Sequence, residues 1–253
     1  MNSFKNLHAQ SYPLILGNVW DVQSALLFQK SGFKAIGTSS DALAKTLGYE
    51  DGERLPFGEL VRTVKNILAK IDIPLTVDIE GGYSNDSSKI IENIVSLYQL
   101  GVVGINIEDS FSNPERKIKE AQQFSKIIKE VKAYLSKNNM EIFINVRTDS
   151  YFMGLENPLE ETIKRIKLYE NNGADGIFVP CVVKEKEICA IVKSTHLPIN
   201  VMCMPELPDF NRLESIGIKR ISMGPFVFNQ MVSKLENSID SIIDGACFNS
   251  LFD

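Results

Sequence analysis

Two consecutive apolar segments of this chain end in carboxylates, in the strings LTVDIE and GINIED. Side chains alternate between the two faces of a strand, so we expect Asp78 and Glu80 on one side of the first segment. Asn106 and Glu108 share one side of the second segment. Carboxylates with no histidine beside them make a hard, oxygen-rich site that suits Mg²⁺ or Mn²⁺. The pattern predicts that Asp78, Glu80 and Glu108 bind a metal ion, the alternative being that they cap helices or pair with basic residues.

An arginine follows at the end of a later apolar segment, in the string NVRTD. The planar fork of donors on Arg147 matches a carboxylate or phosphoryl group in two-point contact. In an acidic cavity it would hold an anionic substrate against the metal. The alternative is an ion pair with Glu108 or Asp149, and both can hold because a buried arginine needs partners. The hydroxyls and amides of residues 38–40 are candidates for binding a second anionic end of the substrate.

These residues need elements that bring several strand ends together. From residue 14 onward, short apolar segments alternate with amphipathic segments eight times. Strands that alternate with helices at this spacing predict a parallel sheet, and eight such units predict closure into a single (β/α)8 TIM-type barrel. The predicted strands are 14–19, 33–40, 75–80, 103–109, 142–149, 176–180, 199–204 and 220–225. The predicted helices are 22–32, 58–70, 87–101, 115–135, 157–173, 184–194, 209–217 and 226–245.

The length of 253 residues fits one barrel domain, with a polar leader over 1–13 and a C-terminal helix and tail over 226–253. The front of that last helix is apolar and needs cover, either from the parent barrel or from a neighbouring subunit. A net charge of -5 gives no reason to expect nucleic acid or an anionic membrane as a partner. The start of the chain lacks the apolar core of a secretory signal, so we expect a cytoplasmic location. Four cysteines without paired spacing indicate reduced thiols.

Five strings of the chain carry a resemblance to a known family: NVWD, GTSSDALAKTLGYEDGE, VDIEGGYS, GINIEDS and NVRTD. In this order and spacing they resemble the isocitrate lyase and phosphoenolpyruvate mutase superfamily, over about residues 15–225. The resemblance implies an (α/β)8 barrel that binds Mg²⁺ and a 2-oxo or enol acid. It also implies a homo-oligomer, a dimer or tetramer, in which the last helix is often exchanged with a neighbour. Members break or make a C–C or P–C bond beside an oxyanion that the metal stabilises.

The resemblance assigns roles to four acids. Asp78 matches the family's most direct metal ligand, whereas Glu80 and Glu108 match acids that reach the metal largely through water. Asp51 matches a catalytic acid in the loop after the second strand. Glu80 stands where many members have Asp, and its longer side chain is compatible with a water-bridged ligand.

The resemblance also assigns substrate-binding roles. Trp20, Ser39 and Ser40 resemble the segments that hold the substrate's carboxylate, although the family often has Gly where Ser40 stands. Arg147 resembles the arginine that binds the other side of the substrate, and the resemblance places Asp78 in contact with the same substrate.

One departure limits the assignment. The family's lyases carry a loop with Cys and His after the fourth strand, and its mutases carry Lys and Asn there. Here the string SFSNPERKIKE is expected to pass from strand to helix almost at once, and Lys117 does not match the mutase spacing. An isocitrate or methylisocitrate lyase is therefore excluded. The remaining candidates for proton transfer are Cys181, Tyr83 and Tyr49, and an inert buried thiol is the commoner role for Cys181.

Three hypotheses follow for function. The first is a Mg²⁺-dependent lyase or hydrolase that cleaves a C–C bond in a small 2-oxo or 2-hydroxy diacid through a metal-stabilised enolate. The second is a phosphonate or enolpyruvyl mutase or hydrolase that acts on a P–C bond. The third is a catalytically silent barrel that binds a metabolite.

Overall fold

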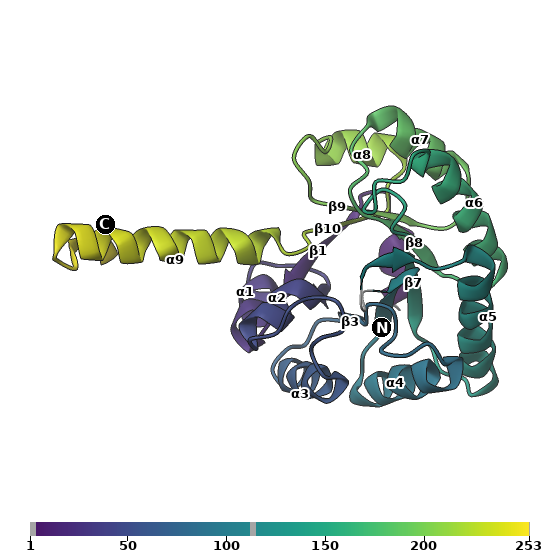
Figure 1. Ribbon diagram of the computed structural model, residues 1–253, viewed down its shortest axis with the longest axis horizontal. Helices are drawn as coiled ribbons and strands as arrows, with labels where there is room; N and C mark the ends of the chain where they lie inside the picture. Colours follow the sequence, from purple (N-terminus) through teal and green to yellow (C-terminus); the bar gives the residue numbers. More distant parts are fainter. Residues whose placement is uncertain (1–3, 112–114, 253) are drawn as a thin grey trace.

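Eight short parallel strands close into a barrel, with β1 paired to both β2 and β10 (Figure 1). The computed structural model describes residues 4–111 and 115–252. Around the barrel the strands are β1 (Leu14–Val19), β2 (Ile36–Thr38), β3 (Leu75–Asp78), β4 (Gly104–Glu108), β7 (Phe143–Arg147), β8 (Gly176–Val179), β9 (Ile199–Met202) and β10 (Arg220–Ser222). The predicted (β/α)8 barrel is confirmed.

Helices surround the strands because each carries an apolar stripe that the sheet covers. In α3 the buried residues Leu60, Val64 and Ile67 recur at helical spacing. Gly101 and Gly217 end α4 and α8 with φ of 103° and 101°, a left-handed conformation that favours glycine. The helices are α1 (Val22–Lys30), α2 (Ser40–Thr46), α3 (Phe57–Leu68), α4 (Ser87–Leu100), α5 (Ala121–Lys137), α6 (Pro158–Asn171), α7 (Glu185–Lys193), α8 (Phe210–Ile216) and α9 (Phe226–Gly245).

The segment after β4 differs from the prediction. The chain was expected to pass almost directly from strand to helix, but β5 (Ser110–Phe111) pairs with β6 (Lys117–Ile118) as a small antiparallel hairpin. Helix α5 therefore begins only at Ala121. The hairpin forms because Arg116 and the backbone N–H of Lys119 both bind acidic or carbonyl groups at the end of β4, which keeps this stretch extended.

Three short pieces of the sequence predictions cannot be compared with the fold. Residues 1–3 of the leader, 112–114 of the segment after β4 and 253 of the tail lie outside the described residues.

The described part of the leader closes the amino-terminal end of the barrel. Phe4 and His8, on a short 3-10 helix (Phe4–His8), are buried against Phe143, and the His8 ring stacks on the Phe143 ring with centroids 4.3 Å apart. Burial and the nearby charge of Arg220 lower the pKa of His8 to about 3. The leader therefore contributes buried aromatic contacts as well as polar residues.

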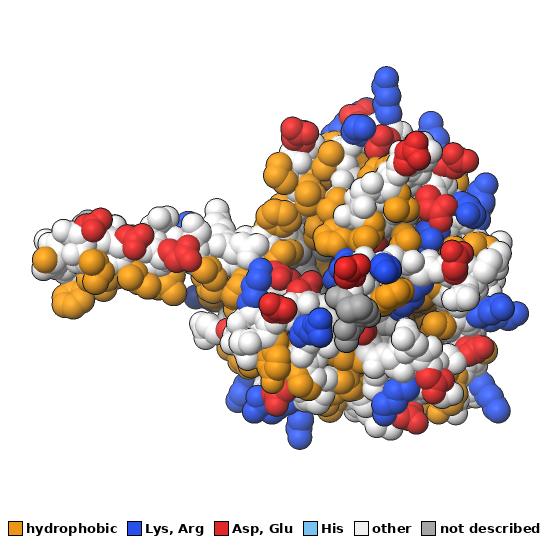
Figure 2. Space-filling model, viewed as in Figure 1, with side chains coloured by type: hydrophobic (Ala, Val, Ile, Leu, Met, Phe, Trp, Pro, Cys, Tyr) orange, Lys and Arg blue, Asp and Glu red, His pale blue; other side chains and the backbone are white. Residues whose placement is uncertain are grey.

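Helix α9 leaves the barrel near α1 and α2 and extends away from it (Figure 1). Its apolar side chains form a stripe along one edge, which Figure 2 shows in orange. Leu235, Ile239 and Ile243 are 58%, 49% and 73% exposed. In the part of the chain that the structure describes, no helix is long and apolar enough to cross a membrane.

Candidate active site

An ion-paired cluster lies at the carboxyl ends of β4 and β7, which are neighbours in the barrel. Arg147 Nη1 is 3.0 Å from Glu108 Oε2, and Arg147 Nε donates to Asp149 Oδ1 at 2.6 Å. Glu108 is 2% exposed and Asp149 is fully buried. Burial alone would lower the pKa of Arg147, but Glu108 and Asp149 raise it above its usual value. Arg147 is therefore charged, and the predicted ion pairs with Glu108 and Asp149 are present.

Arg116 is a second arginine in the cluster, and the sequence interpretation missed it. Its Nη1 lies 2.7 Å from Glu108 Oε1 and 3.2 Å from Asp149 Oδ2, and Nη2 lies 3.6 Å from Asp51 Oδ2. Both arginines face the ring of Phe152, each with Cζ 5.1 Å from its centroid. Two guanidinium groups thus share one set of carboxylates, a geometry that suits a substrate with more than one anionic group.

Asp78 ends β3 and lies beside Asn106 in the register of β3 and β4. Its backbone N–H donates to Thr38 Oγ1 at 2.9 Å, and its Oδ1 accepts from the Glu80 N–H at 3.0 Å. Burial raises the pKa of Asp78, while the charge of Arg147 and hydrogen bonds from Glu80 and Asn106 lower it. A backbone N–H group therefore orients the Asp78 carboxylate.

Glu80 reaches the cluster from a turn, since β3 ends at Asp78. Its φ is 49°, a left-handed conformation that a non-glycine residue rarely adopts. The backbone N–H of Glu53 donates to Glu80 Oε2 at 2.7 Å. Strand alternation was therefore the wrong reason for placing Glu80 near Asp78. Burial and the charges of Asp51, Glu108 and Asp78 raise the pKa of Glu80 to about 9.

The carboxylates suit a hard divalent cation, but too few of them lie close together for all of them to bind it directly. Buried carboxylates with raised pKa values are groups whose ionised form a cation would stabilise. Among the described residues, no three carboxylate, His or Cys groups are gathered closely enough to ligate one ion together. The set fits Mg²⁺ held directly by one carboxylate and otherwise through water, since Mg²⁺ usually keeps several waters.

The predicted substrate-binding residues have structural contacts of their own. Ser39 is the N-cap of α2, with its Oγ accepting from the Ala42 N–H at 3.4 Å, and Ser40 is the first residue of that helix. Trp20 is buried and meets the ring of Phe228 of α9 edge-on, with centroids 5.1 Å apart. Ser39 and Ser40 therefore lie between the end of β2 and the start of α2.

Asp109, the residue after Glu108, faces away from the cluster. Its Oδ2 accepts from Tyr169 Oη at 2.7 Å and pairs with Arg165 Nη1 at 3.0 Å. Consecutive strand residues point to opposite faces, so Glu108 and Asp109 cannot both face the cavity. Asp109 anchors α6 to the end of β4.

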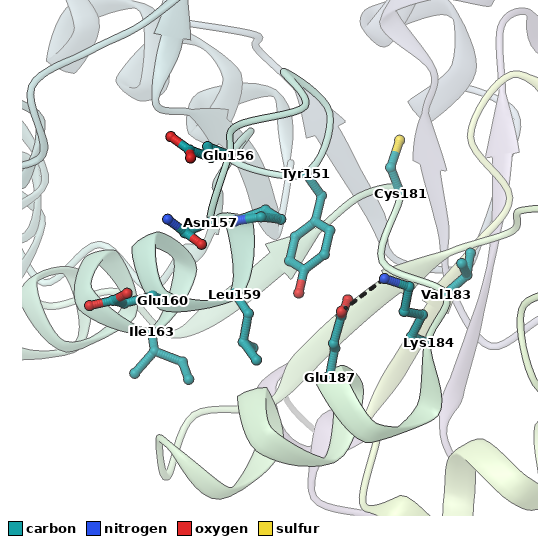
Figure 3. A pocket seen from close by; sticks show the side chains of 11 residues that line it. Tyr151, Glu156, Asn157, Leu159, Glu160, Ile163, Cys181, Val183, Lys184 and Glu187 are labelled. Atoms are coloured by element: carbon teal, nitrogen blue, oxygen red, sulfur yellow. Dashed lines mark hydrogen bonds and ion pairs between the residues drawn. The ribbon is translucent and has the colours of Figure 1, made fainter.

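Two of the candidates for proton transfer, Cys181 and Tyr83, lie near enough to the cluster for its charges to affect their pKa values. Cys181 is half-buried, with burial raising the pKa of its thiol, and it lines a cavity of about 690 Å³ between the starts of α6 and α7 (Figure 3). Tyr151 and Glu187 point into the same cavity. Burial also raises the pKa of Tyr83 far above its usual value, and Tyr49 is exposed.

Lys119 is an amine that the sequence interpretation did not single out. Its Nζ donates to the carbonyl of Gly81 at 3.2 Å, next to Glu80. Burial lowers its pKa, although Glu53 and Glu108 oppose that shift. It directly follows β6, in a stretch that was predicted to be helix, and for this reason the sequence did not direct attention to it.

The raised carboxyl pKa values predict a pH dependence of stability in the metal-free protein. Burial raises the pKa of Glu108 to about 7, and burial with neighbouring acids raises that of Glu80 to about 9. Above the unfolded-state value near 4.3 the folded state then holds more protons than the unfolded state, so stability falls as pH rises from about 5 to 9. Each such proton contributes about 1.4 kcal/mol per pH unit.

Denaturant titrations of the metal-free protein at pH 6, 7 and 8 measure this slope. A Glu80→Gln variant, which cannot ionise, should show a shallower slope. A free energy of unfolding that rises with pH over this range would contradict the assignment of the raised pKa values.

The sequence matches one family model and is similar to known proteins. The phosphoenolpyruvate phosphomutase family model matches residues 4–243. The Mycobacterium tuberculosis (strain ATCC 25618 / H37Rv) protein named "Uncharacterized protein Rv1998c" is 33% identical over 96% of this chain and 90% of its own length. An oxaloacetate decarboxylase of Paraburkholderia xenovorans (strain LB400) is 26% identical over 91% of this chain and 78% of its own.

The fold is also shared with solved structures. A Burkholderia cenocepacia J2315 protein described as a "putative phosphonomutase" superposes with a TM-score of 0.88 at 32% identity, over 94% of this chain and 97% of that one. Its match covers nearly the whole barrel in both proteins.

Proposed function

The chain belongs to the phosphoenolpyruvate phosphomutase family, and from this we propose that it is a Mg²⁺-dependent lyase or hydrolase that cleaves a C–C bond in a small 2-oxo or 2-hydroxy diacid. The resemblance to the isocitrate lyase and phosphoenolpyruvate mutase superfamily is thereby confirmed. One observation carries the proposal: half-buried Asp78 and buried Glu108 end neighbouring strands, buried Glu80 follows in the turn after β3, and two arginines pair with Glu108. The oxaloacetate decarboxylase relative supports the choice of C–C chemistry.

We assign the metal to Asp78 as direct ligand, with Glu80 and Glu108 acting through water. When bound, a divalent cation supplies positive charge that stabilises negative charge developing on a substrate oxygen. Asp78 is suited to this contact because its carboxylate is fixed by the Glu80 N–H at 3.0 Å. Glu80 has one oxygen held by the Glu53 N–H, which orients the other for a bridging water. Both oxygens of Glu108 are held, one by Arg116 and one by Arg147, which fixes this carboxylate in place.

Arg147 and Arg116 bind the anionic ends of the substrate in this proposal. The Arg147 guanidinium is oriented by Asp149 and lies 5.9 Å from the ring centroid of Phe178, so its fork is held before substrate arrives. Arg116 faces the same carboxylates from the hairpin after β4. Asp51, 3.6 Å from Arg116, helps to place that arginine. The α2 amino terminus, with Ser39 and Ser40, and Trp20 complete the carboxylate-binding side.

A second candidate function is cleavage or rearrangement of a P–C bond. The two arginines that share Glu108 and Asp149 favour it, since a phosphoryl group accepts several charge-assisted hydrogen bonds at once. The site differs in this case only in which anion the two guanidinium groups hold.

A panel assay separates the candidates. Oxaloacetate, alkylmalates and phosphonopyruvate are each incubated with the protein and Mg²⁺, and pyruvate, oxalate and phosphate are measured. Release of a 2-oxo acid fragment from a diacid, lost on removal of Mg²⁺ with a chelator, is the expected result. Phosphate release from phosphonopyruvate alone would instead establish the P–C function. Mg²⁺-dependent binding without turnover of any compound would establish a silent metabolite-binding barrel.

We also propose that the protein is a homo-oligomer, a dimer or tetramer, joined through α9. The apolar stripe on α9 consists of residues at helical spacing, and no barrel helix covers it in Figure 1. Leu27 of α1 and Phe210 of α8 are also exposed, at 54% and 43%, on the two helices between which an eighth covering helix is expected. The α9 of a neighbouring subunit would cover both sets of apolar side chains.

The oligomer has a matched test. A Leu235→Asp and Ile239→Asp double variant places two charges on the apolar stripe and should reduce the mass measured by analytical ultracentrifugation to that of a monomer. A Ser233→Asp and Asn237→Asp double variant places the same charges on the opposite face and should leave the mass unchanged. Equal masses for both variants would contradict the role of the stripe.

A further inference from the structure

A layer of polar side chains crosses the interior of the barrel below Asp78. Barrel interiors of this kind are usually filled by branched apolar residues. Here Asn145 Nδ2 donates to Asn106 Oδ1 at 2.9 Å and to Asn200 Oδ1 at 3.1 Å, and Asn200 Nδ2 donates to Ser222 Oγ at 3.1 Å. Arg220, from β10, enters the same layer and donates from Nη2 to Asn106 Oδ1 at 3.2 Å.

Arg220 is an unusual residue for this position. It is 1% exposed, and its Nε and Nη1 have no hydrogen-bond partner among the described residues. Burial lowers the pKa of Arg220 to about 9, and Asp78 opposes that shift. A buried charge with so few protein partners is expected to reduce the stability of the fold. A role in the site above it accounts for such a residue better than a contribution to stability.

The contacts of Asn106 connect Arg220 to the metal site. Asn106 Oδ1 accepts from both Arg220 and Asn145, so the amide cannot rotate by half a turn without placing its Nδ2 against two donors. Its Nδ2 must then point away from them. Asn106 is the neighbour of Asp78 across β3 and β4, where paired residues share one face of the sheet, and its side chain lowers the pKa of the Asp78 carboxyl. The orientation of one amide therefore determines which donor the carboxylate meets.

We propose that Arg220 is a positioning residue that fixes the Asn106 amide from inside the barrel and thereby aims the Asp78 carboxylate at its ligand. This inference rests on the proposed function, in which Asp78 is the direct metal ligand. It adds a contact that supports the metal site from the interior of the barrel, through Asn106.

The direction in which metal affinity changes when Arg220 is replaced distinguishes a positioning role from a purely electrostatic one. A positive charge near a metal site repels the metal, so removing the Arg220 charge would by itself strengthen metal binding. Loss of positioning would weaken it, because substitution of residues that orient metal ligands typically lowers metal affinity about 10- to 100-fold. Weaker binding after removal of the charge therefore cannot come from the charge alone.

The experiment measures Mn²⁺ binding by electron paramagnetic resonance of the free ion, with thermal unfolding of each variant alongside. An Arg220→Met variant should weaken Mn²⁺ binding about 10-fold or more, while its Tm stays equal or rises, since an apolar residue of similar volume replaces a buried charge. An Arg220→Lys variant, which keeps one donor, should bind Mn²⁺ more tightly than Arg220→Met. Mn²⁺ affinity in Arg220→Met that is unchanged or higher would overturn the proposal.

Two further variants test the route and the specificity. If Arg220 acts through Asn106, an Asn106→Leu variant should weaken Mn²⁺ binding to a similar extent, and the double variant should be no weaker than either single variant. Additive losses would overturn this route. Arg165→Met removes another buried arginine, one that pairs with Asp109 outside the site, and should lower Tm without changing Mn²⁺ affinity.

An Asp78→Asn variant distinguishes failure of the proposed role of Arg220 from failure of the proposed metal site. Loss of Mn²⁺ binding in Asp78→Asn, together with full binding in Arg220→Met, would reject the role of Arg220 and leave the proposed metal site in place. Full binding in both variants would reject the metal site itself, and with it the proposed function.

Discussion

An Asp78→Ala variant is expected to lose about 10²- to 10³-fold or more in kcat/KM, the scale seen when one group that stabilises developing charge is removed. The loss should appear in kcat as well as KM, because the metal that Asp78 holds acts on the charge that forms during the reaction. Asp78 is half-buried and makes no ion pair with a basic group within 4 Å among the described residues, so its removal leaves none of them without its partner.

Asp78→Asn is the matched variant, since it keeps the size of the side chain and removes the charge. It should reproduce the loss of activity and should abolish metal-dependent thermal stabilisation. An Asp209→Asn change alters an exposed helix cap and is the control, with kcat/KM unaffected. Turnover of the Asp78→Ala variant at the level of the unaltered protein would show that the metal assignment is wrong.

An Arg147→Lys variant is expected to lower kcat/KM about 100-fold, mainly by raising KM. Lysine keeps the charge but cannot make two-point contact with a carboxylate, nor contact Glu108 and Asp149 together as Arg147 does. Complete removal of the charge is a poorer test. It would leave two buried carboxylates without this partner and cost about 3–5 kcal/mol of stability.

Steady-state kinetics over a range of substrate concentrations separates the effects on KM and kcat. Arg212→Lys is the control, because Arg212 pairs with Glu185 at the surface and faces no part of the site. An Arg147→Lys variant with unchanged KM would show that Arg147 serves only as a partner for Glu108 and Asp149.

The barrel was predictable because its signal repeats. Eight apolar segments and eight amphipathic segments each contribute evidence for one architecture, so an error in one segment does not change the outcome. The hairpin after β4 has no repeat to support it. Its six-residue stretch from Glu115 to Glu120 is rich in charge and helix-compatible, and long-range contacts, such as those of Arg116 with Glu108 and Asp149, keep it extended. Tertiary contacts of this kind are not visible in local sequence pattern.

The site was predictable where strand geometry applies and not where it fails. Asp78, Glu108 and Arg147 lie at strand ends, and their relation follows from the order of the strands. Glu80 adopts a left-handed turn conformation, so the alternation rule does not describe it. Arg220 sits at the start of a strand, near the opposite end of the barrel from the expected chemistry. Its contact with Asn106 depends on side chains that cross the barrel interior, which no spacing along the chain reveals.

The central claim is that Asp78 and its neighbours hold Mg²⁺ so that an enolate-like dianion binds between the metal and Arg147. Oxalate mimics such an enolate without requiring knowledge of the natural substrate. Isothermal titration calorimetry of oxalate, with Mg²⁺ and with a chelator, tests the claim most directly. We predict binding that requires Mg²⁺ and is absent in the Asp78→Asn variant. Oxalate binding that is equal with and without Mg²⁺, or no binding when Mg²⁺ is present, would contradict it.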